Sequence, residues 1–302
     1  MPILSQAPFP SSSSALQSHP VSVVRDFIEE QFFRCAASGL VPRRLFKPRL
    51  PDRDRQASSQ PLKLEIVSHC WKYGRLLNYQ LSSLILHPPQ DCRVTMTVFH
   101  CPDDRDTGRI LDYFAGETVP NVTWNWQALD KERLFRRSIG RNQAALATQA
   151  DWIWFTDCDV TFQAGALDSL AAELSECDAM LTFPQIHQVS EMLHPDDPII
   201  TEAEQAPAVL DLDLSRFEPE RREKAVGGLQ IVRGDVARAI GYCANIGVYQ
   251  RPAKGFGNTW EDRTFRWLLG THGEPLNTSS FYRIRHAPKG RKGSDFRIQA
   301  QD

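Results

Sequence analysis

The stretch WIWFTDCDVTF, residues 152–162, indicates the fold class of this chain. An apolar run, WIWF, leads directly into two carboxylates, Asp157 and Asp159. If a strand continues through them, both acids point to one side and Cys158 to the other, because side chains alternate along a strand. Two neighbouring carboxylates repel each other, and a hard divalent ion is the simplest way to keep both charged. The stretch therefore predicts a buried strand that ends at a metal site.

The overall composition is that of an ordinary globular protein. Of 302 residues, 41% are apolar, and the formal net charge is −2, so no basic field favours nucleic-acid binding. No apolar run reaches the roughly 20 residues of a membrane helix. The first twenty residues lack the basic start and long apolar centre of a signal peptide. The seven cysteines contain no CxxC pair, which fits a reducing compartment, so we expect a cytoplasmic protein.

Residues 1–60 are predicted to be an extension that precedes the main domain. The first twenty are rich in proline and serine and are expected to be disordered. A helical period follows over residues 21–40, and a basic, proline-broken linker comes after it. The basic segment 43–49 is a candidate for peripheral contact with the inner face of an anionic membrane. The alternative is a docking helix followed by a surface strap.

Residues 61–302 are predicted to form one α/β domain. Strand patterns at 62–71, 93–101, 121–129, 151–162 and 178–189 alternate with helix patterns. This alternation predicts a Rossmann-like, mostly parallel sheet with helices on both faces. Ligands of such sheets bind at the carboxyl ends of the strands, where Ser68, His69, Asp103 and Asp104 also fall.

Residues 190–224 break the alternation, because they are acidic and contain several prolines. They are predicted to be a long loop that acts as a lid and orders when the ligand binds. After them come a glycine pair, Gly227 and Gly228, and a glycine-rich loop into a helix, GFGNTWEDRTFRWLLG (255–270). The chain ends with a strand and a basic tail, FYRIRHAPKGRKGSDF (281–296).

In this order of motifs, residues 62–295 resemble a GT-A glycosyltransferase of the family 2-like type. RNQAALATQADWIWFTDCDVTF (141–162) resembles the helix that runs into the family's DxD strand, with DCD as the motif. CPDDRDTGRILDYF (101–114) resembles the acidic loop that meets the nucleotide base and ribose. Residues 255–270 resemble the acceptor loop with its acidic pair. YRIRH (282–286) resembles the late strand of galactosyltransferase-like members, whose histidine ligates the metal.

The resemblance implies a metal-dependent, inverting hexosyltransferase. Its donor would be a nucleotide sugar, with a UDP-sugar favoured, and its acceptor a hydroxyl of a glycan, a lipid-linked or a small molecule. Mn²⁺ or Mg²⁺ would lie on Asp157, Asp159 and His286 and neutralise the departing diphosphate. The donor-binding residues would be Ser68, His69, Asp103, Asp104, Arg137, Arg141, Asn142, Asp157, Arg285, Lys289 and Arg291.

On the acceptor side, the resemblance assigns Gly227, Gly228 and Trp260 to sugar binding. Asp262 would be the general base that removes the acceptor proton, and Glu261 would hold an acceptor hydroxyl. The sequence departs from the galactosyltransferase-like pattern at one metal ligand. That pattern has methionine three residues before the histidine, whereas this chain has Arg283, which cannot ligate a cation.

Three other readings of the same residues are open. A haloacid dehalogenase-like phosphatase would use Asp157 as nucleophile and Asp159 as general acid. Its motif belongs on an early strand, however, and here three predicted strands precede it. A sugar-nucleotide-forming nucleotidyltransferase needs a glycine-rich loop after its first strand, and SHCWKYGRLLN holds one glycine. A non-catalytic sugar-nucleotide-binding relative is the third, and the intact DCD, ED and histidine argue against it.

Overall fold

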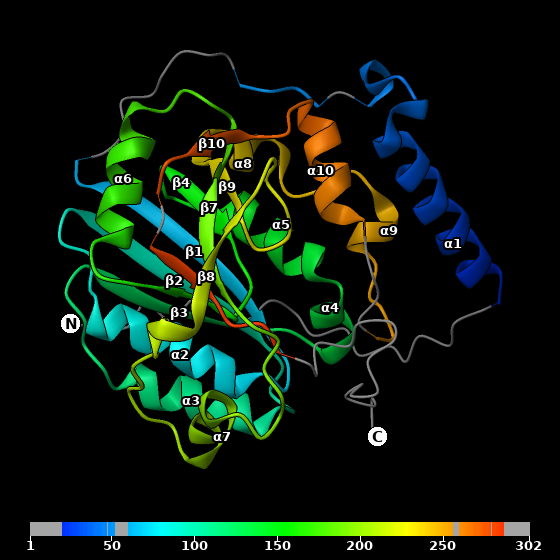
Figure 1. Ribbon diagram of the computed structural model, residues 1–302. Coiled ribbons are helices and arrows are strands. Elements are labelled where there is room, and N and C mark those ends of the chain that lie inside the picture. Colours follow the sequence, from blue (N-terminus) through cyan, green and yellow to red (C-terminus); the bar gives the residue numbers. More distant parts are fainter. Residues whose placement is uncertain (1–19, 47, 52–59, 256–259, 279, 287–302) are drawn as a thin grey trace.

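The structure is a computed structural model that describes residues 20–46, 48–51, 60–255, 260–278 and 280–286 (Figure 1). A seven-stranded sheet runs through its centre in the order β10-β6-β9-β4-β1-β2-β3. The strands are β1 (Leu62–Cys70), β2 (Cys92–His100), β3 (Val122–Ala128), β4 (Trp152–Phe155), β6 (Leu181–Pro184), β9 (Gln230–Arg233) and β10 (Glu274–Leu276). Only β9 runs antiparallel to its neighbours, β4 and β6, so the predicted mostly parallel α/β sheet is confirmed.

Helices cover both faces of this sheet (Figure 1). The helices of the domain are α2 (Gly74–Leu86), α3 (Arg105–Ala115), α4 (Lys131–Phe135), α5 (Arg137–Ala147), α6 (Ala166–Glu176), α7 (Pro198–Gln205), α8 (Gly234–Ile240), α9 (Gly247–Gln250) and α10 (Glu261–Leu269), of which α7 packs on α2. Successive residues of β4 belong to two separate cores on opposite faces of the sheet. Trp154 lies in the core with α2, α3 and α6, and Phe155 lies in the core with α5, α8 and α10. Burial on both faces explains why the central strands read as continuous apolar runs.

A second, four-stranded sheet has the order β5-β11-β7-β8. Its strands are β5 (Val160–Phe162), β7 (Ile186–Ser190), β8 (Phe217–Arg221) and β11 (Phe281–Arg283). The predicted strand 178–189 is therefore divided between β6 in one sheet and β7 in the other. The predicted strand 151–162 is divided in the same way, between β4 and β5.

The prediction of a loop at residues 190–224 was wrong. The segment contains α7, the 3₁₀ turn η3 (Leu214–Arg216) and strand β8. Ile199, Ile200 and Leu212 are buried there in a small core shared with Leu76 and Tyr79 of α2. The apolar residues of this segment occur in groups too short, between acidic residues and prolines, for periodicity to indicate an element. Because they are packed in the structure, the segment gives no support for a lid.

The N-terminal piece is a helix that docks on the domain, followed by two short turns. The elements are α1 (Pro20–Cys35), η1 (Ala36–Leu40) and η2 (Arg43–Leu45), and Figure 1 shows α1 beside α9 and α10. Glu29 accepts a hydrogen bond from the backbone of Val248 at 2.9 Å and pairs with Arg251. Arg43 donates to the Leu268 and Leu269 carbonyls, which favours the docking reading of this piece. Within the described residues, no helix has the length and apolar character needed to cross a bilayer.

His187 on β7 is expected to make the protein less stable in acid. Its side chain is 1% exposed, and burial, with the charge of Arg222, lowers its pKa from 6.5 to about 4. Between pH 6.5 and 4, His187 binds a proton in the unfolded chain but stays neutral in the folded chain, so stability falls as the pH falls towards 4. The free energy of unfolding should drop by about 2 kcal/mol between pH 6.5 and pH 5 from this group.

Urea unfolding at several pH values checks this prediction. The variant His187→Gln should lose that share of the acid dependence, while the exposed His272→Gln should keep it. If the free energy of unfolding depends on pH equally in His187→Gln and in the unchanged protein, other groups cause the acid sensitivity.

Candidate active site

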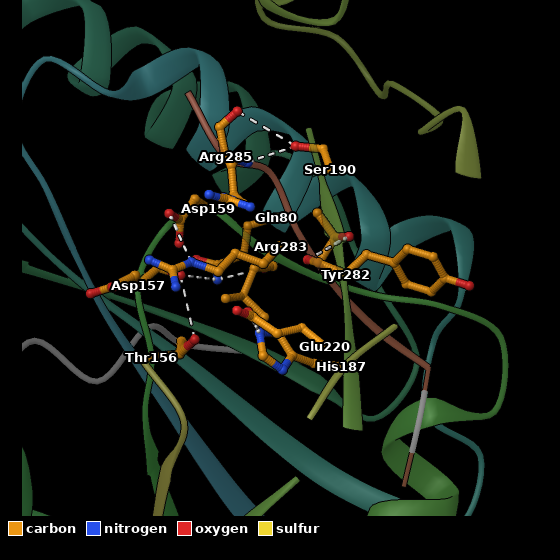
Figure 2. A network of polar contacts seen from close by, with 12 residues as sticks. Gln80, Thr156, Asp157, Asp159, His187, Ser190, Glu220, Tyr282, Arg283 and Arg285 are labelled. Atoms are coloured by element: carbon orange, nitrogen blue, oxygen red, sulfur yellow. Dashed lines mark hydrogen bonds and ion pairs between the residues drawn. The ribbon is translucent and has the colours of Figure 1, made fainter. Parts of the chain in front are cut away.

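The two acids of DCD lie in a turn, not in a strand as predicted. β4 ends at Phe155, and the backbone N–H of Val160 donates to the Asp157 carbonyl at 3.3 Å, which closes the turn. The chain must turn here because β5 belongs to the second sheet. The amide of Gln80 on α2 donates to the carbonyls of Asp157 and Val160 at 2.9 and 2.8 Å (Figure 2). The side-chain directions are therefore set by the turn rather than by strand alternation.

Asp157 is held by arginines at the start of α5. Arg137 Nη1 donates to Asp157 Oδ1 at 2.9 Å, and Arg141 Nη2 lies 3.9 Å from the same oxygen. Burial alone lowers the pKa of Arg137, but the charges of Asp157 and Glu261 outweigh it, and the pKa is raised. Arg137 therefore stays charged beside the first acid of the motif.

Asp159 is held by Arg283 of β11. The Asp159 side chain is 1% exposed, and its Oδ2 lies 3.4 Å from Arg283 Nε (Figure 2). The negative charge of Asp159 raises the pKa of Arg283, and Asp157 adds to the effect. Antiparallel pairing places Arg283 opposite Val160, next to the turn, and Ile284 N–H donates to the Asp159 carbonyl at 2.8 Å.

A glycine pair joins this turn to the acidic start of α10. Gly227 N–H donates to Asp262 Oδ2 at 3.2 Å, and Asp262 also lies 3.5 Å from Arg266. The next residue, Gly228, is so close to the turn that a Cβ there would lie 2.9 Å from the Asp157 backbone nitrogen. This close approach requires glycine. Asp157 and Asp262 therefore share one edge of the molecule although 104 residues separate them in sequence.

The two members of the acidic pair have different surroundings. The Asp262 side chain is 26% exposed, whereas Glu261 as a whole is 2% exposed. Within the described residues, neither Glu261 carboxylate oxygen has a hydrogen-bond partner. The charge of Glu261 raises the pKa of Arg137, and the charge of Asp157 raises it more. Asp262 is thus the member that a bound molecule can reach from outside.

Ser68 and His69 lie near the end of β1, beneath the turn. Ser68 is fully buried and donates to Gln80 Oε1 at 2.7 Å, so it supports the turn through Gln80. His69 stacks on Phe99 with ring centroids 5.0 Å apart. Burial, together with the charges of Arg141 and Arg137, lowers the pKa of His69 well below its ordinary value, so the ring is neutral. Gln80 is a supporting residue that sequence reasoning missed, because it lies in the middle of an apolar helix.

Other predicted donor residues are occupied by internal hydrogen bonds. Asp104 caps α3 and accepts from the backbone and hydroxyl of Thr107 and from the backbone of Lys72. The Asn142 amide oxygen accepts from the Tyr242 backbone at 2.9 Å, which fixes the segment after α8. Asp103 is exposed in the loop after β2 and is the member of this acidic pair that faces solvent.

The remaining predicted residues lie at the margins of the site. Trp260 precedes α10, with the Arg34 and Arg263 guanidinium groups 4.7 and 5.9 Å from its ring centroid. The Arg285 backbone N–H donates to Ser190 Oγ at 2.8 Å. His286 is 2% exposed and meets the Tyr73 ring edge to face at 5.2 Å. Lys289 and Arg291 lie outside the described residues.

The predicted metal ligands do not assemble as a metal site. The described part of the chain contains no group of three or more His, Cys, Asp or Glu residues placed to hold a metal ion, so Asp157, Asp159 and His286 do not form one. Guanidinium groups take the place next to both acids. The donor set therefore does not fit a three-ligand ion, and Mn²⁺ or Mg²⁺ stays a prediction.

Comparison with known proteins identifies no family. No protein-family model and no curated protein matches the sequence. Among solved structures, S. aureus TarS 1–349 has a TM-score of 0.45 and 14% identity over 74% of this chain and 60% of that one. TarS 1–349 in complex with UDP-GlcNAc has a TM-score of 0.42 and 13% identity over 74% of this chain and 59% of that one. The chain thus spans less than two thirds of the TarS fragments it matches, and the likeness concerns the fold only.

Proposed function

We propose that this protein is a glycosyltransferase that moves a sugar from a nucleotide-sugar donor to an acceptor hydroxyl. One observation carries the proposal: the DCD turn, the glycine pair and the acidic start of α10 meet at one edge of the sheet. Gly227 N–H on Asp262 and the contact between Gly228 and Asp157 make this junction. The turn follows the carboxyl end of β4, where α/β sheets bind their ligands.

The junction provides the two halves of a displacement at a sugar carbon. Arginines at the turn can hold the anionic diphosphate of the donor through charge-assisted hydrogen bonds. Asp262, on the other side of the glycine pair, can take the proton of an acceptor hydroxyl as that hydroxyl attacks. With the leaving group and the base on opposite sides, the transfer inverts the sugar carbon. The hexosyl class of the sugar, the preference for UDP and the cytoplasmic location belong to this proposal.

The acceptor is a further part of the proposal. Trp260 can stack on a sugar ring at the entrance of α10, because an aromatic face packs well on the apolar face of a sugar. A glycan, a lipid-linked or a small-molecule hydroxyl would reach Asp262 from this side. Contact of segment 43–49 with a membrane would suit a lipid-linked acceptor.

Calorimetric titration with UDP-, GDP- and dTDP-sugars, including UDP-GlcNAc, tests the proposal. We expect one nucleotide class to bind with Kd between about 1 μM and 1 mM, the usual range for enzyme substrates. Arg137→Ala should weaken that binding, because it removes a charged donor from the turn. The exposed Arg221→Ala on β8 is the matched control and should bind like the unchanged protein. Failure of all three classes to bind, combined with turnover of an aryl phosphate that Asp157→Asn abolishes, would favour a phosphatase instead.

A further inference from the structure

Arg283 occupies the position where the resembled pattern has a metal-ligating methionine, and it makes a specific contact there. Its Nε lies 3.4 Å from Asp159 Oδ2, on a carboxylate that is 1% exposed. The backbone fixes this pair on both sides of the contact. Arg283 pairs with Val160 of β5 and with Val189 of β7, and Ile284 N–H donates to the Asp159 carbonyl. The guanidinium is therefore a built part of the turn.

The other acid of the motif is arranged in the same way. Asp157 Oδ1 accepts from Arg137 Nη1 at 2.9 Å and lies 3.9 Å from Arg141 Nη2. A divalent ion placed on these two carboxylates would face at least two guanidinium groups at short range. Like charges at such separations repel strongly where water is scarce. The acids thus have their positive partners from the protein itself.

Arg283 also keeps donors for a ligand. A guanidinium carries five N–H donors in a planar fork, and the contact with Asp159 uses the one on Nε. Its Nη1 and Nη2 groups make no hydrogen bond to any other described residue. Such a fork matches two oxygens of a phosphate group and stays charged at all physiological pH values.

We propose that Arg283, held by Asp159, takes the part of the divalent cation and, with Arg137, held by Asp157, binds the diphosphate of the donor directly. This inference rests on the proposed function, because it names how the same site recognises a nucleoside diphosphate. In this arrangement the acids of DCD orient guanidinium groups instead of ligating a metal. Donor binding then requires no added ion.

The first test is calorimetric titration of the unchanged protein with UDP, and with GDP and dTDP in parallel, in EDTA and again in Mn²⁺. We expect Kd values for the binding nucleotide that agree within about threefold, less than 1 kcal/mol. Binding that needs Mn²⁺, or that Mn²⁺ tightens by more than about tenfold, would overturn the inference and leave the proposed function standing. Absence of binding in both buffers would overturn the proposed function and the inference together.

Variants at position 283 provide the second test. Arg283→Met removes the fork and supplies a thioether, so we expect affinity in EDTA to fall about 10–100-fold, the worth of charged hydrogen bonds. The affinity of Arg283→Lys should lie between that of Arg283→Met and that of the unchanged protein. Arg221→Met on β8 is the matched control and should bind like the unchanged protein. Circular dichroism shows which variants fold. If Arg283→Met does not fold, Arg283→Lys and the EDTA comparison decide. Unchanged affinity of a folded Arg283→Met in EDTA would contradict the inference.

Discussion

Replacement of Asp262 by asparagine is expected to lower kcat by roughly 10²–10⁴-fold, the usual loss when a general base is removed. The asparagine side chain would keep an oxygen that can accept from Gly227 N–H, so the junction with the glycine pair should survive. It cannot take up the proton of an acceptor hydroxyl, however. Donor affinity should stay within a few-fold, because the proposed diphosphate site beside Asp157 lies on the other side of Gly227 and Gly228.

Glu261→Gln is the matched comparison, because consecutive helical residues point about 100° apart and only one of the pair can face the acceptor. Glu261 is 2% exposed and its charge helps to raise the pKa of Arg137, so its loss should act mainly on the site's arrangement. The measurement is initial transfer rates with saturating donor, together with calorimetric donor affinity. If Glu261→Gln loses the transfer rate and Asp262→Asn does not, the roles are reversed. If both remain active, the base lies elsewhere and an inverting mechanism is no longer supported.

Gly234→Ala is expected to destabilise the fold by about 3 kcal/mol, at the upper end of overpacking costs. Gly234 begins α8, and its N–H donates to the Asp151 carbonyl at 2.7 Å. A Cβ at this position would overlap the Ala150 carbonyl oxygen and lie 3.0 Å from that of Asp151. Both obstacles are backbone atoms just before β4, so no side-chain rotation relieves the clash.

Gly108→Ala in α3 is the matched control for this prediction. A Cβ at Gly108 meets nothing within 4 Å. Alanine is the better helix former, so this change should stabilise the protein by roughly 0.5–1 kcal/mol. Urea unfolding of both variants measures the free energy of unfolding directly. A loss below about 1 kcal/mol for Gly234→Ala would show that α8 shifts at little cost.

The sequence by itself determined the α/β architecture, because that architecture depends on local patterns. The alternation of short apolar runs with helical periods sets which residues face the two cores. Trp154 and Phe155, adjacent in sequence, pack in opposite cores. The approximate positions of the strands, the docking helix near residues 21–40 and the proximity of the DCD acids to the end of a central strand all follow from it.

Tertiary structure alone decided what the two acids of the motif do. Asp159 pairs with Arg283 across 124 positions, and Gln80 holds the turn from 77 positions away. No periodicity encodes such pairs, because the first arises when β11 is inserted between β5 and β7 in the second sheet, and the second when α2 packs against the turn. The same long-range packing turned residues 190–224 from a predicted loop into α7 and β8. The sequence could place Asp159 at the edge of the sheet. The positive charge beside it is that of Arg283, which lies on β11, a strand whose position depends on the whole fold.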